Sequence, residues 1–140
     1  NYHAVELYPV EKENYTKLNF SESIGENKNT LLQLHEVNWE EESEINKSFL
    51  LTKHKTSLEK YTSKVKFDII YFDAFSPNKQ PELWTKSIFI KMYNILKNDG
   101  FLVTYCAKGS FRRTLKSIGF NVISLDGPLG KRQMTRANRI

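Results

Sequence analysis

The segment FDIIYFDAFSP (residues 67–77) decides the predicted fold. Its first six residues form a nearly continuous apolar run of strand length, which is typical of a parallel strand buried on both faces. The run ends abruptly at Asp73, and Pro77 follows, so a loop is expected directly after the strand. In sheets of this kind, ligands bind at the carboxyl ends of the strands, so the residues after each apolar run are the informative ones.

The segments on either side alternate between strand and helix patterns. The acidic run at 40–42 is expected to be an exposed connection, and the turn at 98–100 is expected to end the clearest helix. The alternation predicts a single α/β domain over residues 1–140, with a mainly parallel sheet and helices on both faces. The expected strands are 2–8, 49–52, 67–72, 101–106, 120–125 and one starting near 133, and the expected helices are 10–20, 30–39, 57–61, 84–97 and 111–118.

Composition narrows the class of protein. The chain has 140 residues, enough for one domain with a buried core, and its 39% of hydrophobic residues excludes a disordered chain. No stretch approaches the roughly 18 apolar residues of a membrane helix, and the first residues lack a signal-peptide pattern. Cys106 is the only cysteine, so a reducing, cytoplasmic location is the simplest interpretation. The chain opens without Met on a strand pattern, and we interpret it as an N-terminally incomplete piece of a longer protein.

Charge is distributed unevenly along the chain. Residues 1–47 carry ten acidic and four basic side chains, a net charge of −6, whereas residues 104–140 carry one acidic and eight basic, a net charge of +7. A basic C-terminal part suits a polyanionic partner, although a solvated basic face explains the same charge. Two basic pairs are placed to contact phosphates: Arg112-Arg113 in the helix expected at 111–118, and Lys131-Arg132 in a glycine-bounded loop.

Two carboxylates follow expected strands. Glu6 lies near the end of the first strand, where a carboxylate can accept hydrogen bonds from both hydroxyls of a ribose; the alternative is an exposed glutamate on an edge strand. Asp73 is costly at the end of a buried strand unless a polar group meets it, so it is expected to hold an amine of the substrate or cofactor; the alternative is a cap for the turn. Cys106 also follows a strand, but no histidine is near it in sequence, so we assign it no chemistry. The three histidines show no metal-binding spacing, so no metal is predicted.

Several segments together resemble one known family. The most specific signature is FDAFSP (72–77) followed by PELW (81–84), and it resembles the methyltransferase domain of MnmC-like tRNA 5-methylaminomethyl-2-thiouridine methyltransferases. VELYP (5–9) is similar to the family's second strand, whose acid binds the cofactor ribose. The resemblance spans nearly the whole chain and is strongest over 67–134. The other matching segments, in register, are DGFLVTY (99–105), FRRTL (111–115), GF (119–120) and GPLGKRQM (127–134).

The resemblance implies a Rossmann-like class I methyltransferase fold that transfers a methyl group from S-adenosylmethionine to the aminomethyl nitrogen of a wobble uridine in tRNA. It implies that Glu6 holds the cofactor ribose and that Asp73, with Ala74, lies beside the sulfonium and the incoming amine. Asp73 is then the catalytic residue, which orients the amine and accepts its proton. The cofactor already carries an activated methyl group, so no metal is required. The other implied residues are Phe75, Pro77 and Trp84 for the base pocket, and Arg112, Arg113, Lys131 and Arg132 for the tRNA backbone.

The chain departs from the family pattern in its first half. The family's first strand and its glycine-rich loop, which receives the methionine part of the cofactor, are missing, and Gly25 stands alone there. Where the family places an acid after its third strand, near the adenine, this chain has Lys55-Thr56-Ser57, so the Ser57 hydroxyl is expected to substitute. Some relatives fuse this domain to a flavin-dependent oxidase, which makes such an oxidase, fused or separate, an expected partner.

Two alternative functions stay open. An aminopropyl transferase similar to spermidine synthases shares the fold and also uses an acid after the fourth strand, but the basic C-terminal part argues against a polyamine substrate. A catalytically silent RNA-binding fragment is the second alternative, and the missing cofactor loop favours it. Binding of S-adenosylmethionine separates the silent fragment from the enzymes, and methylation of undermethylated tRNA separates the two enzymes.

Overall fold

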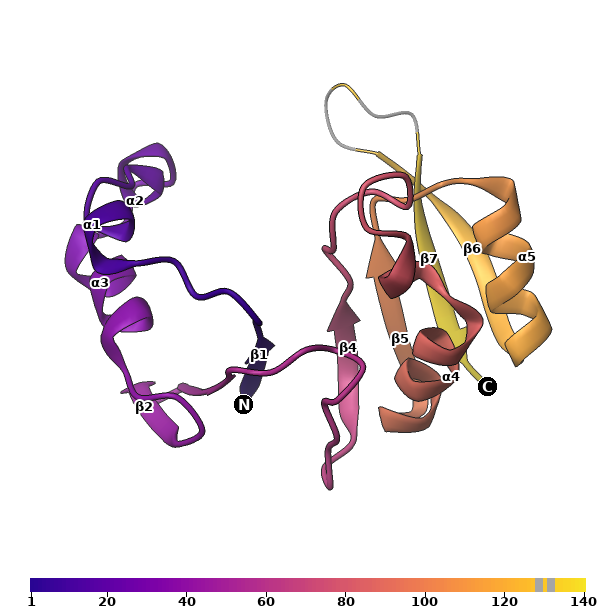
Figure 1. The fold of residues 1–140 in the computed structure, drawn as a ribbon, viewed down its shortest axis with the longest axis horizontal. Helices are drawn as coiled ribbons and strands as arrows, with labels where there is room; N and C mark the ends of the chain where they lie inside the picture. Colours follow the sequence, from indigo (N-terminus) through magenta and orange to yellow (C-terminus); the bar gives the residue numbers. More distant parts are fainter. Residues whose placement is uncertain (128–129, 131–132) are drawn as a thin grey trace. The chain divides into compact units, whose positions relative to one another are not determined.

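A computed structural model describes residues 1–127, 130 and 133–140. The chain divides into an N-terminal unit (Asn1–Tyr61) and a C-terminal unit (Thr62–Ile140), each of which is described by itself. The single domain expected over 1–140 stays a prediction. The N-terminal unit contains β1 (Tyr2–Val5), α1 (Lys12–Tyr15), α2 (Phe20–Ser23), α3 (Lys28–Glu36), β2 (Glu42–Asn46) and β3 (Phe49–His54) (Figure 1). The C-terminal unit contains β4 (Phe67–Tyr71), the 3-10 helix η1 (Pro81–Trp84), α4 (Lys86–Ile95), β5 (Leu96–Thr104), α5 (Gly109–Ile118), β6 (Phe120–Asp126) and β7 (Gln133–Arg139).

The sheet of the N-terminal unit has the strand order β1-β3-β2. Strand β1 runs parallel to β3, with Val5 opposite His54, and β2 runs antiparallel to β3. The central strand β3 contributes the buried side chains Leu51, Thr52 and Lys53. Because β1 and β3 are parallel, their carboxyl ends lie at the same edge of this sheet.

The connections of the N-terminal unit differ from the sequence prediction. Residues 10–20, expected as one helix, contain only the short helix α1 and the first residue of α2. Tyr15 is the only buried hydrophobic residue in this stretch, and short helices are marginal without packing. Strand β2 includes part of the acidic run expected to be a connection. Ile45 is its only apolar residue, so no alternating apolar pattern indicated a strand. The helix expected at 57–61 is only a turn, in which Lys60 and Tyr61 donate backbone hydrogen bonds to the Ser57 carbonyl.

Lys53 fastens helix α3 to the sheet. Although this lysine is only 6% exposed, its Nζ donates a hydrogen bond of 2.6 Å to the His35 carbonyl near the end of α3. The same Nζ lies 4.8 Å from the centre of the Trp39 ring. A cation is favourable both at the C-terminus of a helix and over an aromatic face. Burial lowers the pKa of Lys53 from its ordinary value.

The sheet of the C-terminal unit has the strand order β4-β5-β7-β6. Strand β4 runs parallel to β5, whereas β7 runs antiparallel to both β5 and β6. Two of the five strand pairings described in the two units are parallel, so the expectation of a mainly parallel sheet is wrong. The connections explain this difference, because the stretches between β2 and β3 and between β6 and β7 are too short to hold a crossover helix.

The core of the C-terminal unit lies between this sheet and helices α4 and α5. The two helices pack against each other, which places both on one face of the sheet (Figure 1). Helices on its second face stay a prediction. The helix expected at 84–97 is divided, because Thr85 has an extended backbone (φ −80°, ψ 156°) that separates η1 from α4. Helix α5 ends at Gly119 as predicted, and the φ of +116° there is a left-handed conformation that favours glycine.

The turn expected at 98–100 lies inside β5. Asp99 adopts a φ of +64°, and the pairing with β4 shifts register in this region. A Cβ on Gly100 would lie 2.9 Å from the Lys97 carbonyl oxygen and 3.0 Å from that of Asp68, so the strands approach too closely for another residue. The glycine therefore serves a bulge within the sheet and does not cap α4.

Strand β4 is less buried than its sequence predicted. Ile69 and Tyr71 are 39% and 63% exposed. The strand is at the end of its sheet, and among the described residues it pairs only with β5. The expected burial of this strand on both faces is therefore wrong in the described structure.

No helix in the described part of the chain has the length and apolar character to cross a bilayer.

Candidate active site

Glu6 directly follows β1 at the carboxyl edge of the N-terminal sheet. Its backbone N–H donates to the His54 carbonyl (3.0 Å), which continues the parallel pairing one residue beyond the strand. Its exposed carboxylate accepts one hydrogen bond through Oε1, from the backbone N–H of Tyr8 (2.8 Å). The Tyr8 bond orients the carboxylate, and each carboxylate oxygen has two acceptor positions, so the group retains capacity for further hydroxyl donors.

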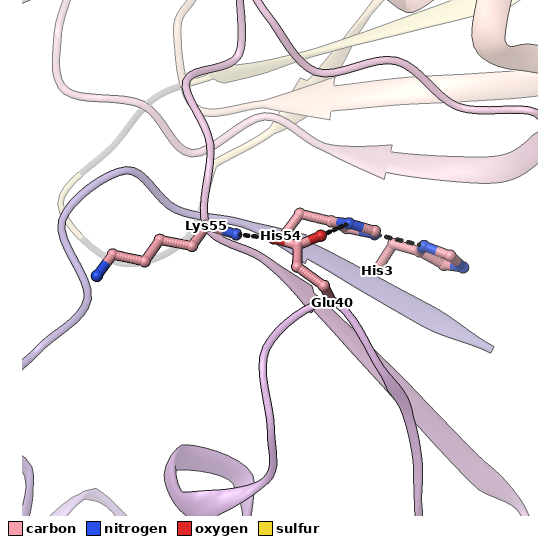
Figure 2. Close-up of polar contacts among 4 residues, drawn as sticks. All are labelled: His3, Glu40, His54 and Lys55. Atoms are coloured by element: carbon pink, nitrogen blue, oxygen red, sulfur yellow. Dashed lines mark hydrogen bonds and ion pairs between the residues drawn. The ribbon is translucent and has the colours of Figure 1, made fainter.

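Beside Glu6, the end of β3 carries a chain of hydrogen bonds that sequence analysis missed. His3 Nδ1 lies 3.0 Å from His54 Nε2, and His54 Nδ1 lies 3.0 Å from Glu40 Oε2 (Figure 2). Glu40 Oε1 accepts a 2.7 Å hydrogen bond from the backbone N–H of Lys55. Glu40 adopts a left-handed φ of +63°, a strained conformation for this residue type.

The side chains of this chain of hydrogen bonds influence one another's pKa values. Hydrogen bonds from the Lys55 backbone and the His54 side chain lower the pKa of the Glu40 carboxyl. Burial, followed by repulsion from His54, lowers the pKa of His3. The pattern thus indicates an ionised Glu40 at one end of the hydrogen-bond chain and, at the other end, a His3 imidazole that is less readily protonated. The partners are 14 and 51 residues apart, so no local spacing could have predicted them.

The loop that follows β4 presents Asp73 at the carboxyl edge of the C-terminal sheet. Phe72 N–H donates to the Val103 carbonyl (2.9 Å), so the loop begins in register with β5. The Asp73 side chain is exposed. Burial raises the pKa of the Tyr105 hydroxyl, and the charges of Cys106 and Asp73 add to this rise.

Three side chains hold the backbone after Asp73. Tyr105 Oη donates to the Ala74 carbonyl (2.7 Å), and Trp84 Nε1 donates to the Phe75 carbonyl (2.7 Å). Phe75 N–H donates to Gln80 Oε1 (3.2 Å). The Phe75 ring itself is 71% exposed. Sequence analysis expected Phe75 and Ala74 in the site, but it did not find Tyr105 or Gln80 as their supports.

Trp84 is a supporting residue in the described structure. Its ring packs edge-on against Phe72 and Phe111, with centroids 5.1 Å apart in each pair. A tilted contact with Phe89 at 6.1 Å joins the same cluster. Trp84 thus connects the core to the Phe75 carbonyl, while its predicted place in the base pocket stays a prediction, as does that of Pro77, which is partly exposed.

The two arginines of α5 differ in their surroundings. The Arg112 guanidinium donates its hydrogen bonds within the C-terminal unit. Its Nε donates to Thr135 Oγ1 (2.9 Å), and its Nη atoms donate to Gln133 Oε1, Ser124 Oγ and the Met134 carbonyl. Arg113 is exposed. Contacts of both with tRNA stay predictions, and Arg113 has the more available guanidinium. Lys131 and Arg132 lie outside the described residues.

The expected site draws on both units. Glu6 and Ser57 belong to the N-terminal unit, and Asp73, Ala74 and Phe75 belong to the C-terminal unit. Ser57 is partly exposed just beyond β3, and its role near an adenine stays a prediction. The described residues contain no group of three or more His, Cys, Asp or Glu side chains arranged to hold a metal ion.

Comparison with known proteins identifies the family. A family model described as S-adenosyl-L-methionine-dependent methyltransferase matches residues 16–140. The chain belongs to this family. The expected α/β methyltransferase class also agrees with the crystal structure of MNMC2 from Aquifex aeolicus, which is 31% identical with a TM-score of 0.54, over 62% of this chain and 29% of that one.

Two curated relatives of this S-adenosylmethionine-dependent methyltransferase are named tRNA 5-methylaminomethyl-2-thiouridine biosynthesis bifunctional protein MnmC. The relative from Actinobacillus pleuropneumoniae is 35% identical over 74 residues, which are 53% of this chain and 11% of the relative. The relative from Ralstonia nicotianae is 40% identical over 70 residues, which are 50% of this chain and 11% of the relative. The chain spans about a tenth of the length of these relatives.

The residues present fit the nucleoside part of S-adenosylmethionine. A ribose offers two hydroxyl donors, and the exposed Glu6 carboxylate at the end of a parallel strand has the acceptors to meet them. When bound, the cofactor supplies a methyl group already activated by a positively charged sulfur. That Glu6 holds the ribose of the cofactor stays a prediction.

Proposed function

We propose that the protein transfers a methyl group from S-adenosylmethionine to the aminomethyl nitrogen of a modified wobble uridine in tRNA. Family membership establishes the class of reaction, and the similarity to MnmC proteins supports the substrate. The observation that carries the proposal is Asp73, an exposed carboxylate at the carboxyl end of β4 whose flanking backbone is fixed by neighbouring side chains.

Asp73 has two tasks in this reaction. An amine attacks a methyl carbon only as a neutral nucleophile in line with the carbon–sulfur bond, so orientation supplies much of the rate. The Asp73 carboxylate accepts a hydrogen bond from the amine and holds its lone pair toward the methyl group. As the nitrogen–carbon bond forms and the carbon–sulfur bond breaks, the nitrogen becomes positive, and Asp73 accepts its proton and passes it to water.

The other expected residues bind substrate and cofactor. Glu6 holds the ribose of the cofactor, and Ser57 and Ala74 line the remainder of its site. Phe75 offers an exposed ring on a fixed backbone, which suits stacking against an unpaired base. Arg113, with Lys131 and Arg132, meets the tRNA phosphates. A tRNA substrate fits a cytoplasmic location, and the word bifunctional in the relatives' name is consistent with a partner activity such as an oxidase, fused or separate.

The test is methylation by the full-length protein. Undermethylated tRNA and S-adenosylmethionine are incubated with the protein, and the nucleosides are analysed by mass spectrometry for the 5-methylaminomethyl form. The Asp73→Asn variant keeps the size of the side chain and loses its charge, and we expect its turnover to fall by about 10²- to 10⁴-fold.

Asp68→Asn is the matched control. Asp68 is the second residue of β4, the strand before Asp73, and its carboxylate forms an exposed ion pair with Lys97 at 2.9 Å. Exposed pairs contribute at most about 1 kcal/mol, so this variant keeps both fold and turnover. A wild-type protein that binds S-adenosylmethionine but methylates no tRNA overturns the proposed substrate. If the full-length protein binds no S-adenosylmethionine, the result favours the catalytically silent alternative. Wild-type turnover in Asp73→Asn removes this residue from the mechanism.

A further inference from the structure

The backbone around Asp73 is fixed from both sides. Before it, Phe72 N–H bonds to β5; after it, the Ala74 carbonyl accepts the hydroxyl proton of Tyr105 at 2.7 Å. These two bonds span one residue on either side of Asp73, whose own side chain is exposed. A residue held in this way keeps its Cα–Cβ bond in one direction, which limits the positions that its carboxylate can reach.

Tyr105 is suited to this task by its place in the sheet. It directly follows β5, and β5 runs parallel to β4, so both strands end at the same edge. Its ring packs edge-on against Trp84, with centroids 6.2 Å apart and an interplanar angle of 73°. The ring is therefore anchored to the aromatic core while the hydroxyl reaches the loop.

The hydroxyl of Tyr105 remains a donor in the working range of pH. Burial raises the pKa of this hydroxyl, and the charges of Cys106 and Asp73 raise it further. A protonated phenol donates to a carbonyl, whereas a phenolate would repel it. The raised pKa thus keeps the phenol protonated and able to donate the hydrogen bond that holds the loop.

We propose that Tyr105 is a positioning residue for methyl transfer: its hydroxyl holds the Ala74 carbonyl and so fixes the Asp73 carboxylate against the methyl-accepting amine. This inference rests on the proposed function. It extends the site to a residue after β5 that does not itself touch the reacting atoms. Without this hydroxyl, the peptide between Ala74 and Phe75 keeps only the hydrogen bond from Phe75 N–H to Gln80 Oε1, so the segment next to Asp73 is held less tightly.

Tyr105→Phe in the full-length protein removes only the hydroxyl. A displacement of about 1 Å in a catalytic group costs up to about 10²-fold, so we expect kcat to fall by about 10- to 100-fold. The KM values for tRNA and for S-adenosylmethionine stay close to those of the wild type, because the hydroxyl contacts neither. An unchanged kcat overturns the inference. A raised KM at unchanged kcat also overturns it, since the hydroxyl then binds a substrate.

Tyr93→Phe is the matched control. Tyr93 Oη also donates to a backbone carbonyl of the same unit, that of Ile140, at 3.2 Å. Both variants lose one hydroxyl and one such bond, so their melting temperatures should agree. A loss of kcat in both variants indicates a general loss of stability and overturns the positioning role.

A local measurement separates this inference from the proposed function. Hydrogen exchange of the amides at 74–76 should accelerate by roughly 2- to 10-fold in Tyr105→Phe and stay unchanged in Tyr93→Phe. Unchanged exchange in both variants overturns the inference even if the protein methylates tRNA. If the wild-type protein methylates no tRNA, the proposed function fails, and faster exchange in Tyr105→Phe then assigns the hydroxyl to the loop alone.

Discussion

The C-terminal unit buries eleven hydrophobic side chains among its described residues, whereas the N-terminal unit buries three, Tyr15, Leu51 and Tyr61. The difference lies in how each unit supports its strand ends. In the C-terminal unit, an aromatic cluster around Phe89 and Trp84 extends to the loop that carries Asp73. In the N-terminal unit, polar and charged contacts surround the strand end near Glu6 (Figure 2). The strand end near Asp73 is thus supported by packing, and the strand end near Glu6 is supported by hydrogen bonds and charge.

Truncation of one core residue in each unit tests this difference with the largest effect. Phe89 is fully buried, and its ring lies 5.0 Å from those of Phe72 and Phe111, so Phe89→Ala should destabilise the C-terminal unit by about 3 to 5 kcal/mol. Leu51→Ala in the N-terminal unit should cost about 2 kcal/mol, at the low end for leucine, because a thin core collapses around the gap.

The two tryptophans allow each unit to be followed separately during denaturant unfolding. Trp84 belongs to the C-terminal unit and Trp39 to the N-terminal unit, and the chain has no other tryptophan. Fluorescence in a Trp39→Phe background therefore reports Phe89→Ala, and fluorescence in a Trp84→Phe background reports Leu51→Ala. Equal losses in the two units would contradict the contrast between a packed and a polar support.

The C-terminal unit could be predicted closely because its sequence signals are local. The apolar spacing and Gly119 placed the helix at 111–118, where α5 ends at Ile118, and the strand expected at 120–125 is β6. The position of Asp73 in a loop after a strand could be predicted because an apolar run ends there, while its role in the site stays a prediction. In the N-terminal unit, by contrast, Ile45 alone gave no pattern for β2, and the weak spacing at 10–20 overestimated a helix.

The supports of the site could not be predicted, because their partners are distant in sequence. Tyr105 is 31 residues from Ala74, and His54 is 51 residues from His3. A tyrosine after a strand has many possible hydrogen-bond partners, and only the parallel register of β4 and β5 selects the Ala74 carbonyl. Trp84 belongs to the signature segment, but no sequence signal indicated that its ring packs against Phe72 and Phe111; its expected place in the base pocket stays a prediction. Composition and spacing indicate candidate catalytic and binding residues, but they do not indicate which distant residues support these candidates by hydrogen bonds or packing.

A second prediction, with an effect of intermediate magnitude, concerns the two arginines of α5 in the C-terminal unit. Arg112 joins α5 to β6 and β7 through four hydrogen bonds, so Arg112→Ala should lower the free energy of unfolding of this unit by about 2 kcal/mol. Arg113→Ala should leave stability unchanged and weaken tRNA binding, with a salt dependence reduced by about one phosphate contact. Denaturant unfolding measures the stability of each variant, and tRNA binding at several salt concentrations measures its phosphate contacts. A loss of stability in Arg113→Ala with unchanged stability in Arg112→Ala would refute the prediction.

The smallest effect is a response to pH that only one unit should show. All three histidines belong to the N-terminal unit, so between about pH 7.5 and 5.5 its stability should change while that of the C-terminal unit stays constant. Burial lowers the pKa of His35, with Lys53 adding to it, and burial and His54 lower that of His3. The unfolded chain therefore binds more protons than the folded one, and stability falls as the pH drops below the ordinary histidine pKa of 6.5.

Hydrogen exchange in the full-length protein measures this response for both units in one sample, after correction for the intrinsic effect of pH on exchange. Protection of β1 and β3 should decrease on acidification, while protection of β5 and β7 should stay level. Substitution of His35 by Phe keeps a ring stacked on Tyr15, whose centroid lies 4.5 Å away, and removes one titrating group, so the pH response should become shallower. Glu40 adds a second phase in more acidic solution: its folded pKa is lowered, so its contribution is present above about pH 4.5 and is lost as the pH falls through the folded value. A parallel decrease in protection in both units would show that charge at the Glu6 edge does not distinguish the N-terminal unit from the packed C-terminal unit.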